Sequence, residues 1–142
     1  KMFVVFPHRS LDDTHPLMRG FDDIYYFPHS RHTAVDRQDI AKVKDLQILS
    51  YSDISGVNIV ADMECRNFFI MGHCEYDRDT LAKEYFRDVE KGLKIDIPYN
   101  YFPNDDTNAV PKMTWKSTAN LLFNNWLNYF VYQKTPYDLN TL

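Results

Sequence analysis

The sequence predicts an α/β protein in which strands come first and helices follow. Two observations support this fold class: short apolar runs fill the first half of the 142 residues, and two stretches of helical periodicity fill the second half. The composition fits a folded domain with its own core, because 44% of the residues are hydrophobic and 25% are charged. We therefore expect one sheet accompanied by two long helices.

The strands are predicted at five apolar runs bounded by residues that favour turns. These runs are Met2–Phe6, Ile24–Phe27, Leu46–Tyr51, Val57–Ala61 and Phe68–Met71. Pro7 and Pro28 are expected to end the first two runs. The last three runs are closely spaced, which favours a meander or neighbouring strands of one sheet. Residues 37–44 are expected to form a short turn of helix.

Two amphipathic helices are predicted in the second half. The first begins at a cap on Asp79 or Thr80 and ends at Gly92. The second runs from about Trp115 to Gln133, before Pro136. The apolar stripe of the first is Leu81, Ala82, Tyr85, Phe86 and Val89, and that of the second is Trp115, Ala119, Leu122, Phe123, Trp126 and Phe130. The Pro- and Asn-rich stretch between them predicts an ordered loop.

Charge, cysteine content and hydropathy argue against several classes of protein. A net charge of −4 argues against binding to nucleic acid. Two cysteines are too few for a disulfide scaffold, so a reducing, cytoplasmic compartment is expected. No apolar run approaches the ~20 residues that span a bilayer, and no signal-peptide pattern follows Lys1. The five histidines show no metal-ligand spacing, so no bound metal is expected.

The most suggestive local feature is His73-Cys74-Glu75, which follows an apolar strand and Gly72. Residues two apart in an extended segment point to the same side, so His73 and Glu75 are expected to lie together. A carboxylate beside an imidazole fixes its tautomer and stabilises the imidazolium, as a catalytic base requires. From spacing alone, a solvated pair of loop residues is the alternative interpretation.

Other reactive side chains have more than one interpretation. Cys74 should point away from His73, and a buried apolar role is favoured over that of a nucleophile. Cys65 lies in a predicted turn. Arg87 fits either a solvated surface arginine or a clamp for a substrate carboxylate. The polar string from Pro28 to His32 fits a site lining and a surface turn equally well.

Seven strings in order resemble one family along the whole chain. They are Arg19-Gly20-Phe21-Asp22-Asp23, Pro28-His29-Ser30-Arg31, Gly72-His73-x-Glu75-Tyr76-Asp77, Glu84-Tyr85-Phe86-Arg87-Asp88, Tyr101-Phe102-Pro103-Asn104-Asp105, Asn124-Asn125-Trp126-Leu127-Asn128-Tyr129 and Thr135-Pro136-Tyr137-Asp138-Leu139. Together they are similar to the homoserine O-acyltransferases of methionine biosynthesis, of the O-succinyltransferase type, some of which use acetyl-CoA.

The resemblance implies a fold, a reaction and residue roles. The fold is flavodoxin-like, related to class I glutamine amidotransferases, and the protein is a homodimer. A cysteine takes an acetyl or succinyl group from acyl-CoA as a thioester and passes it to the hydroxyl of L-homoserine. His73 is then the base and Glu75 its orienting partner, while Lys1, Ser30 and Arg87 contact substrate. No bound cofactor is implied beyond acyl-CoA as co-substrate.

This chain also departs from the family pattern. Family members are about twice as long, and their nucleophilic cysteine and oxyanion hole precede the position of Lys1. Residues 1–142 are therefore expected to be the C-terminal portion of a single acyltransferase domain, inactive alone. Cys74 stands where the family usually has another residue, and His32 stands where tyrosine is common. Two alternatives remain: a glutamine amidotransferase-like hydrolase, which also uses Cys with His-x-Glu, and a non-catalytic fragment.

Overall fold

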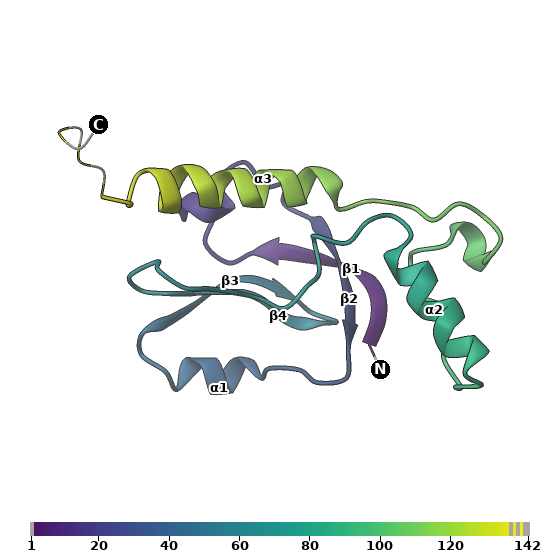
Figure 1. Ribbon diagram of the computed structural model, residues 1–142. Helices are drawn as coiled ribbons and strands as arrows, with labels where there is room; N and C mark the ends of the chain where they lie inside the picture. Colours follow the sequence, from purple (N-terminus) through teal and green to yellow (C-terminus); the bar gives the residue numbers. More distant parts are fainter. Residues whose placement is uncertain (1, 137, 139, 141–142) are drawn as a thin grey trace.

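The computed structural model describes residues 2–136, 138 and 140, and its strands and helices form the mixed α/β fold that the sequence predicts (Figure 1). The strands are β1 (Met2–Ser10), β2 (Tyr25–Arg31), β3 (Leu46–Ser52), β4 (Gly56–Asp62) and β5 (Phe68–Ile70). The helices are α1 (Arg37–Ala41), α2 (Thr80–Glu90) and α3 (Lys116–Trp126), and α3 continues as the π-helix η3 (Leu127–Tyr132). Short 3-10 helices cover Pro16–Met18 and Pro103–Asp105.

The five strands form one sheet of order β2-β1-β3-β4-β5, and every neighbouring pair is antiparallel. The long strand β1 changes partner along its length. Its residues from Met2 to His8 pair with β2, whereas Arg9 and Ser10 pair with β3. The sheet is therefore curled, and β3, β4 and β5 follow one another as the predicted meander.

The expectation that Pro7 and Pro28 end their strands is wrong. Pro7 lies inside β1 opposite Tyr26, and Pro28 lies inside β2 opposite Val5. The Pro28 carbonyl accepts a hydrogen bond from outside the β1–β2 ladder, so the missing N–H of Pro28 faces the same outer side. In β1, the Phe3 carbonyl and the Val5 N–H likewise bond to the backbone of Tyr99, on the side away from β2. Because every second residue of a strand directs its backbone groups to the same side, the missing N–H of Pro7 also faces away from β2. Neither proline removes a hydrogen bond from this ladder.

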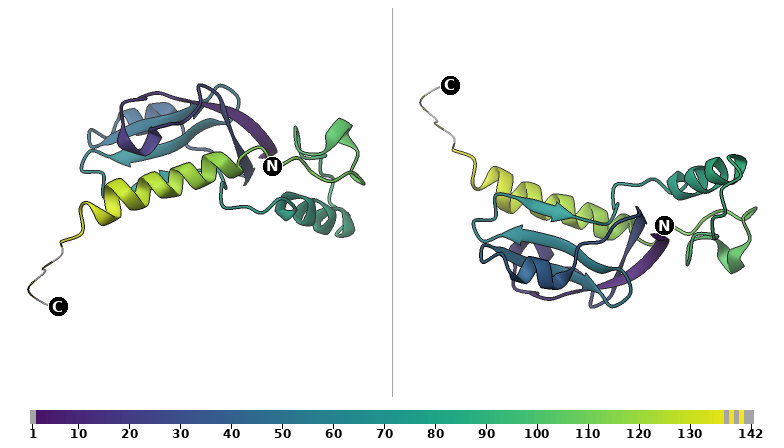
Figure 2. Two further views of the ribbon diagram at one scale, coloured as in Figure 1. Left: turned by 90° about the horizontal axis from the view of Figure 1, so that it is seen from above. Right: turned by 90° about the horizontal axis from the view of Figure 1, so that it is seen from below.

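Two apolar clusters make up the core. The first lies between the sheet and α3 and contains Leu17, Met18, Tyr25, Phe27, Leu49, Ile59, Ala61, Cys74, Ala119 and Leu122. The second joins β1 to α2 and to the loop before α3, and contains Phe3, Val5, Leu81, Ala82, Tyr101, Phe102 and Trp115. Seen from above and below, α3 lies across the sheet, while α2 and the loop after it project beyond the edge of the sheet near the N-terminus (Figure 2).

Helix α2 ends as predicted but buries less of its stripe than predicted. Gly92 has φ +71°, and its N–H and that of Leu93 donate to the carbonyls of Val89 and Asp88, as in a Schellman motif. Leu81 is buried, whereas Val89 is 45% exposed. Only the first turns of α2 reach the second cluster, because the helix extends away from the sheet.

Helix α3 is also confirmed, and its apolar face is only partly covered. Trp115, Ala119 and Leu122 are buried, whereas Phe123 and Trp126 are each 41% exposed. After Trp126 the helix changes to π-helical winding, which has more residues per turn than an α-helix. The apolar stripe predicted with α-helical spacing therefore does not continue on one face there. Among the described residues, no helix has both the length and the apolar character to cross a membrane.

Candidate active site

His73 and Glu75 lie in the loop that follows β5, and they are in direct contact. The Nδ1 atom of His73 is 2.8 Å from Oε1 of Glu75, and their side chains are 37% and 56% exposed. The expected contact between the two side chains is therefore confirmed, but it forms in a turn, in which the Tyr76 N–H donates to the His73 carbonyl over 3.1 Å, and not in an extended segment. With the carboxylate accepting the Nδ1 proton, Nε2 carries the lone pair that can take a proton from a reacting group.

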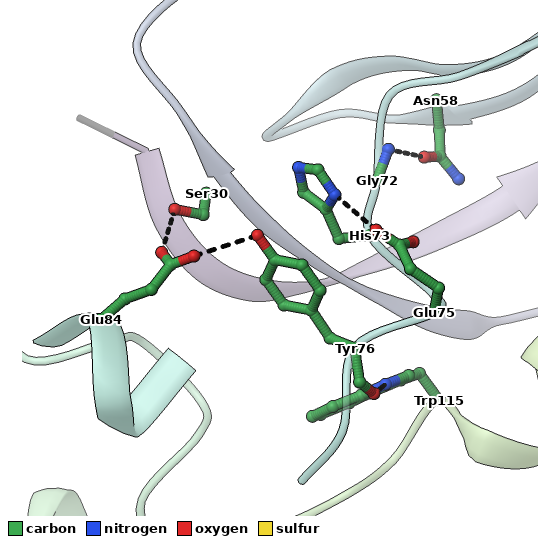
Figure 3. Close-up of polar contacts among 8 residues, drawn as sticks. All are labelled: Ser30, Asn58, Gly72, His73, Glu75, Tyr76, Glu84 and Trp115. Atoms are coloured by element: carbon green, nitrogen blue, oxygen red, sulfur yellow. Dashed lines mark hydrogen bonds and ion pairs between the residues drawn. The ribbon is translucent and has the colours of Figure 1, made fainter. Parts of the chain in front are cut away.

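Backbone hydrogen bonds hold this loop against two strands. The His73 N–H donates to the Pro28 carbonyl of β2 over 2.8 Å. The Gly72 N–H donates to Oδ1 of Asn58 in β4 over 3.1 Å (Figure 3). The Met71 N–H donates to the Asn58 carbonyl over 2.7 Å. Asn58 is fully buried, so its side chain gives the loop a fixed support.

The close packing around Gly72 leaves no room for a side chain at this position. A Cβ atom added at Gly72 would lie 2.8 Å from Oδ1 of Asn58 and 2.9 Å from Cβ of Phe27. Both distances are shorter than carbon contacts allow, and Phe27 is fully buried in the first core cluster. The absence of a side chain thus lets the loop pass close to β2 and bring His73 beside it.

Tyr76 stacks on the His73 imidazole. The two ring centroids are 4.5 Å apart and the ring planes differ by 14°. The Tyr76 hydroxyl donates to Oε1 of Glu84 over 3.1 Å. Burial, followed by the negative charge of Glu84, raises the pKa of Tyr76 to about 12. The phenol therefore stays protonated and remains a donor at neutral pH.

Glu84 joins the predicted substrate-contacting Ser30 to this loop. The Ser30 hydroxyl donates to Oε2 of Glu84 over 2.5 Å, while the other carboxylate oxygen accepts from Tyr76 (Figure 3). Sequence reasoning assigned no role to Tyr76 or Glu84. Two signals were available: Tyr76 directly follows the His-x-Glu motif, and Glu84 lies one helical turn before Arg87.

Arg87 is paired with its neighbour in α2. Its Nη2 and Nε atoms lie 2.7 and 2.9 Å from Oδ1 of Asp88. Asp88 is buried, whereas the Arg87 side chain is 53% exposed. The hydrogen bond to Asp88, with added attraction from Asp88 and Glu84, raises the pKa of Arg87. Arg87 is therefore a partly exposed arginine paired with Asp88, and the clamp interpretation stays a prediction.

The polar string around Ser30 belongs to β2, so it is not a surface turn. His29 is fully buried, with its Nε2 atom 3.0 Å from Nε2 of His8. Burial, with His8 next in importance, lowers the pKa of His29 to about 3, so it is neutral. Arg31 donates to the Ser55 carbonyl. Lys1, a predicted substrate contact, lies outside the described residues.

Neither cysteine of the chain is placed to act with His73. Cys74 is buried in the first core cluster, and burial raises the pKa of its thiol to about 12. Cys65 lies in the turn between β4 and β5, at the far end of β5 from His73, with its Sγ 3.4 Å from Nε2 of His15. Among the described residues, no cluster of three or more His, Cys, Asp or Glu side chains could hold a metal ion.

The fold and site define an α/β protein with a partly exposed imidazole–carboxylate pair in the loop after β5. Comparison with known proteins gives the family: the family model for homoserine O-succinyltransferase matches residues 1–137, so the chain belongs to that family. Homoserine O-acetyltransferases of Clostridium beijerinckii and Acetivibrio thermocellus are 58% and 56% identical to it over all 142 residues. The chain covers 47% of each, so it spans about half the length of these curated relatives.

The close approach at Gly72 generates a prediction. Gly72→Ala should destabilise the complete protein by about 1–3 kcal/mol, because the added methyl group overpacks against Phe27 and Asn58. Chemical denaturation measures the loss. Gly92→Asn is the control: nothing lies within 4 Å of a Cβ at Gly92, and asparagine tolerates its positive φ. Equal stability of Gly72→Ala and the unsubstituted protein would contradict the account.

Proposed function

We propose that the protein containing this chain transfers an acetyl or succinyl group from acyl-CoA to the hydroxyl of L-homoserine, the first committed step of methionine biosynthesis. Membership of the family supports this activity. The relatives are named as acetyltransferases and the family model as a succinyltransferase, so both acyl donors stay in the proposal. The observation that carries it is the 2.8 Å contact between His73 Nδ1 and Glu75 Oε1.

In this proposal, a cysteine outside residues 1–142 is the nucleophile, and His73 moves the protons. The cysteine thiolate attacks the thioester carbonyl, the bond to the CoA sulfur breaks, and the leaving thiolate receives a proton from the imidazolium. The homoserine hydroxyl then gives its proton to Nε2 of His73 and attacks the enzyme thioester, which releases the cysteine thiolate. Glu75 holds the imidazole and stabilises its charged form in both steps.

Ser30 and Arg87 are proposed to contact the acceptor substrate. The Asp88 contacts occupy Nε and Nη2 of Arg87, so Nη1 is the nitrogen that can turn toward a carboxylate. Arg87 lies one helical turn after Glu84, which bonds Ser30, so α2 can present the guanidinium near β2. Lys1 is proposed as a further contact. Orienting homoserine in this way would place its hydroxyl for attack.

We also propose how this chain sits in the complete protein. Its strands would extend a larger flavodoxin-like, class I glutamine amidotransferase-like sheet, of which residues 1–142 are the C-terminal portion. The complete protein is proposed to be a cytoplasmic homodimer. Without the nucleophile, the isolated 142 residues should show no turnover, so they serve as a negative control in assays.

The proposed function is tested with the complete protein and its two candidate acyl donors. Incubation with acyl-CoA and L-homoserine should release CoA and form the O-acyl ester of homoserine. Mass spectrometry detects both products. In the absence of homoserine, labelled CoA should exchange into acyl-CoA, which shows that the acyl group forms a thioester with the enzyme. Hydrolysis of glutamine without release of CoA would contradict the proposal and support the amidotransferase-like alternative.

Loss of the imidazole should affect both half-reactions. His73→Ala in the complete protein should slow CoA exchange and transfer to homoserine by about a hundredfold or more, the usual range for a lost general base. Stopped-flow measurement of each half-reaction checks this result. The exposed His32 supplies the control variant His32→Ala. Near-normal turnover of His73→Ala would remove His73 from the mechanism.

Loss of the Arg87 guanidinium should affect one substrate only. Arg87→Ala should raise the KM for homoserine by roughly tenfold or more, because a charge-assisted carboxylate contact is lost, and should leave CoA exchange unchanged. Lys83→Ala removes a cation one turn earlier in α2, whose pair with Asp79 is exposed, and should have no such effect. If Arg87→Ala leaves the KM for homoserine unchanged, Arg87 is a surface residue and does not contact the substrate.

A further inference from the structure

We infer that Tyr76 is a positioning residue for the His73 base, and that Glu84 and Trp115 fix Tyr76 in place (Figure 3). This inference rests on the proposed function, because it concerns the same imidazole. In the proposed steps, the Tyr76 ring and the Glu84 carboxylate contact neither the acyl group nor the nucleophile. The inference gives both side chains a positioning role.

The imidazole needs more support than Glu75 alone provides. Glu75 holds one ring atom, Nδ1, and it lies in the same irregular loop as His73. A single hydrogen bond leaves the ring able to swing about that contact. The Tyr76 ring, parallel to within 14° at 4.5 Å, covers one face of the imidazole and restricts this motion. The same face of the phenol ring stabilises the imidazolium that forms during proton transfer.

Tyr76 is itself held at both of its ends. The backbone carbonyl of Tyr76 accepts a hydrogen bond from Nε1 of Trp115 over 2.9 Å, and Trp115 is fully buried in the second core cluster. The phenol O–H donates to Oε1 of Glu84 over 3.1 Å. Because the phenol is protonated throughout the range of enzyme assays, this donor bond persists. The ring under His73 is therefore tied to the core and not only to the loop.

Glu84 connects this support to the elements that carry the proposed substrate contacts. One of its oxygens accepts from Tyr76 in the loop, and the other accepts from Ser30 in β2. Glu84 itself lies in α2, one turn before Arg87. One carboxylate thus links the loop, the strand and the helix, and it couples the position of the base to that of the acceptor-binding side chains.

The charged and titratable groups around this support come from three segments. Glu75 contacts His73 from the loop, and the neutral His29 lies close on β2. Glu84 and Arg87 on α2 both act on the Tyr76 phenol, with opposite signs. Substitutions of Tyr76 to apolar residues leave all four of these groups in place, so they isolate the effect of the ring and its hydroxyl.

The test uses the complete protein with Tyr76→Leu and Tyr76→Phe. Tyr76→Leu removes the stack and should lower kcat about tenfold with little change in the KM for either substrate. Tyr76→Phe keeps the ring and loses only the bond to Glu84, so kcat should fall about threefold. The double variant Tyr76→Phe with Glu84→Ala should lose less than the sum of the two single effects, because both changes break the same contact.

A structural readout separates this inference from the proposed function. In the NMR spectrum, stacking on Tyr76 should shift the His73 ring protons upfield, and Tyr76→Leu should abolish that shift while Tyr76→Phe retains it. Tyr132→Leu, at an exposed tyrosine of η3, is the control and should change neither kcat nor these protons. An active enzyme whose kcat and His73 resonances survive Tyr76→Leu would overturn the inference alone. A complete protein without acyl transfer would overturn the proposed function, and the ring-proton shift would still decide whether Tyr76 holds His73.

Discussion

The candidate site depends on one backbone hydrogen bond, from the N–H of His73 to the carbonyl of Pro28. His73 follows β5 and Pro28 lies within β2, and these two strands form opposite edges of the sheet. The bond is possible because the sheet curls, because Pro28 turns its carbonyl outward, and because Gly72 has no side chain to strike Phe27. This junction places His73 against Pro28, two residues from Ser30 in β2, although 42 residues separate His73 from Ser30 in sequence.

Around this junction, direct contacts join three side chains to His73 or to Ser30. Glu75 takes the imidazole Nδ1, Tyr76 covers a ring face, and Glu84 accepts from both Tyr76 and Ser30. These contacts hold the proposed base and the proposed acceptor-binding residues in one frame before any substrate binds. Such preorganisation is what proton transfer to and from positioned groups requires. The buried thiol of Cys74, with its raised pKa, takes no part in this frame.

The sequence was sufficient for those features that depend on local spacing. The His-x-Glu spacing indicated the contact of His73 with Glu75, although the segment is a turn and not extended. Helical periodicity located α2 and α3, and Gly92 marked the end of α2. Features that depend on long-range packing were not accessible in this way. The stack of Tyr76 and the double contact of Glu84 require that α2 docks against β2, and no local pattern encodes that docking. For the same reason, the exposure of Val89 and the continuation of β1 through Pro7 differ from expectation.

The central claim is that this chain supplies the base and the acceptor side of an acyl-transfer site, while the nucleophilic thiol lies elsewhere in the protein. The most direct measurement is peptide mapping by mass spectrometry after the complete protein, carrying Cys65→Ser and Cys74→Ser, reacts with acyl-CoA. The account predicts that an acyl-thioester still forms, on a cysteine outside residues 1–142. Loss of the acyl adduct in the folded variant, or its location on Cys65 or Cys74 in the unsubstituted protein, would contradict it.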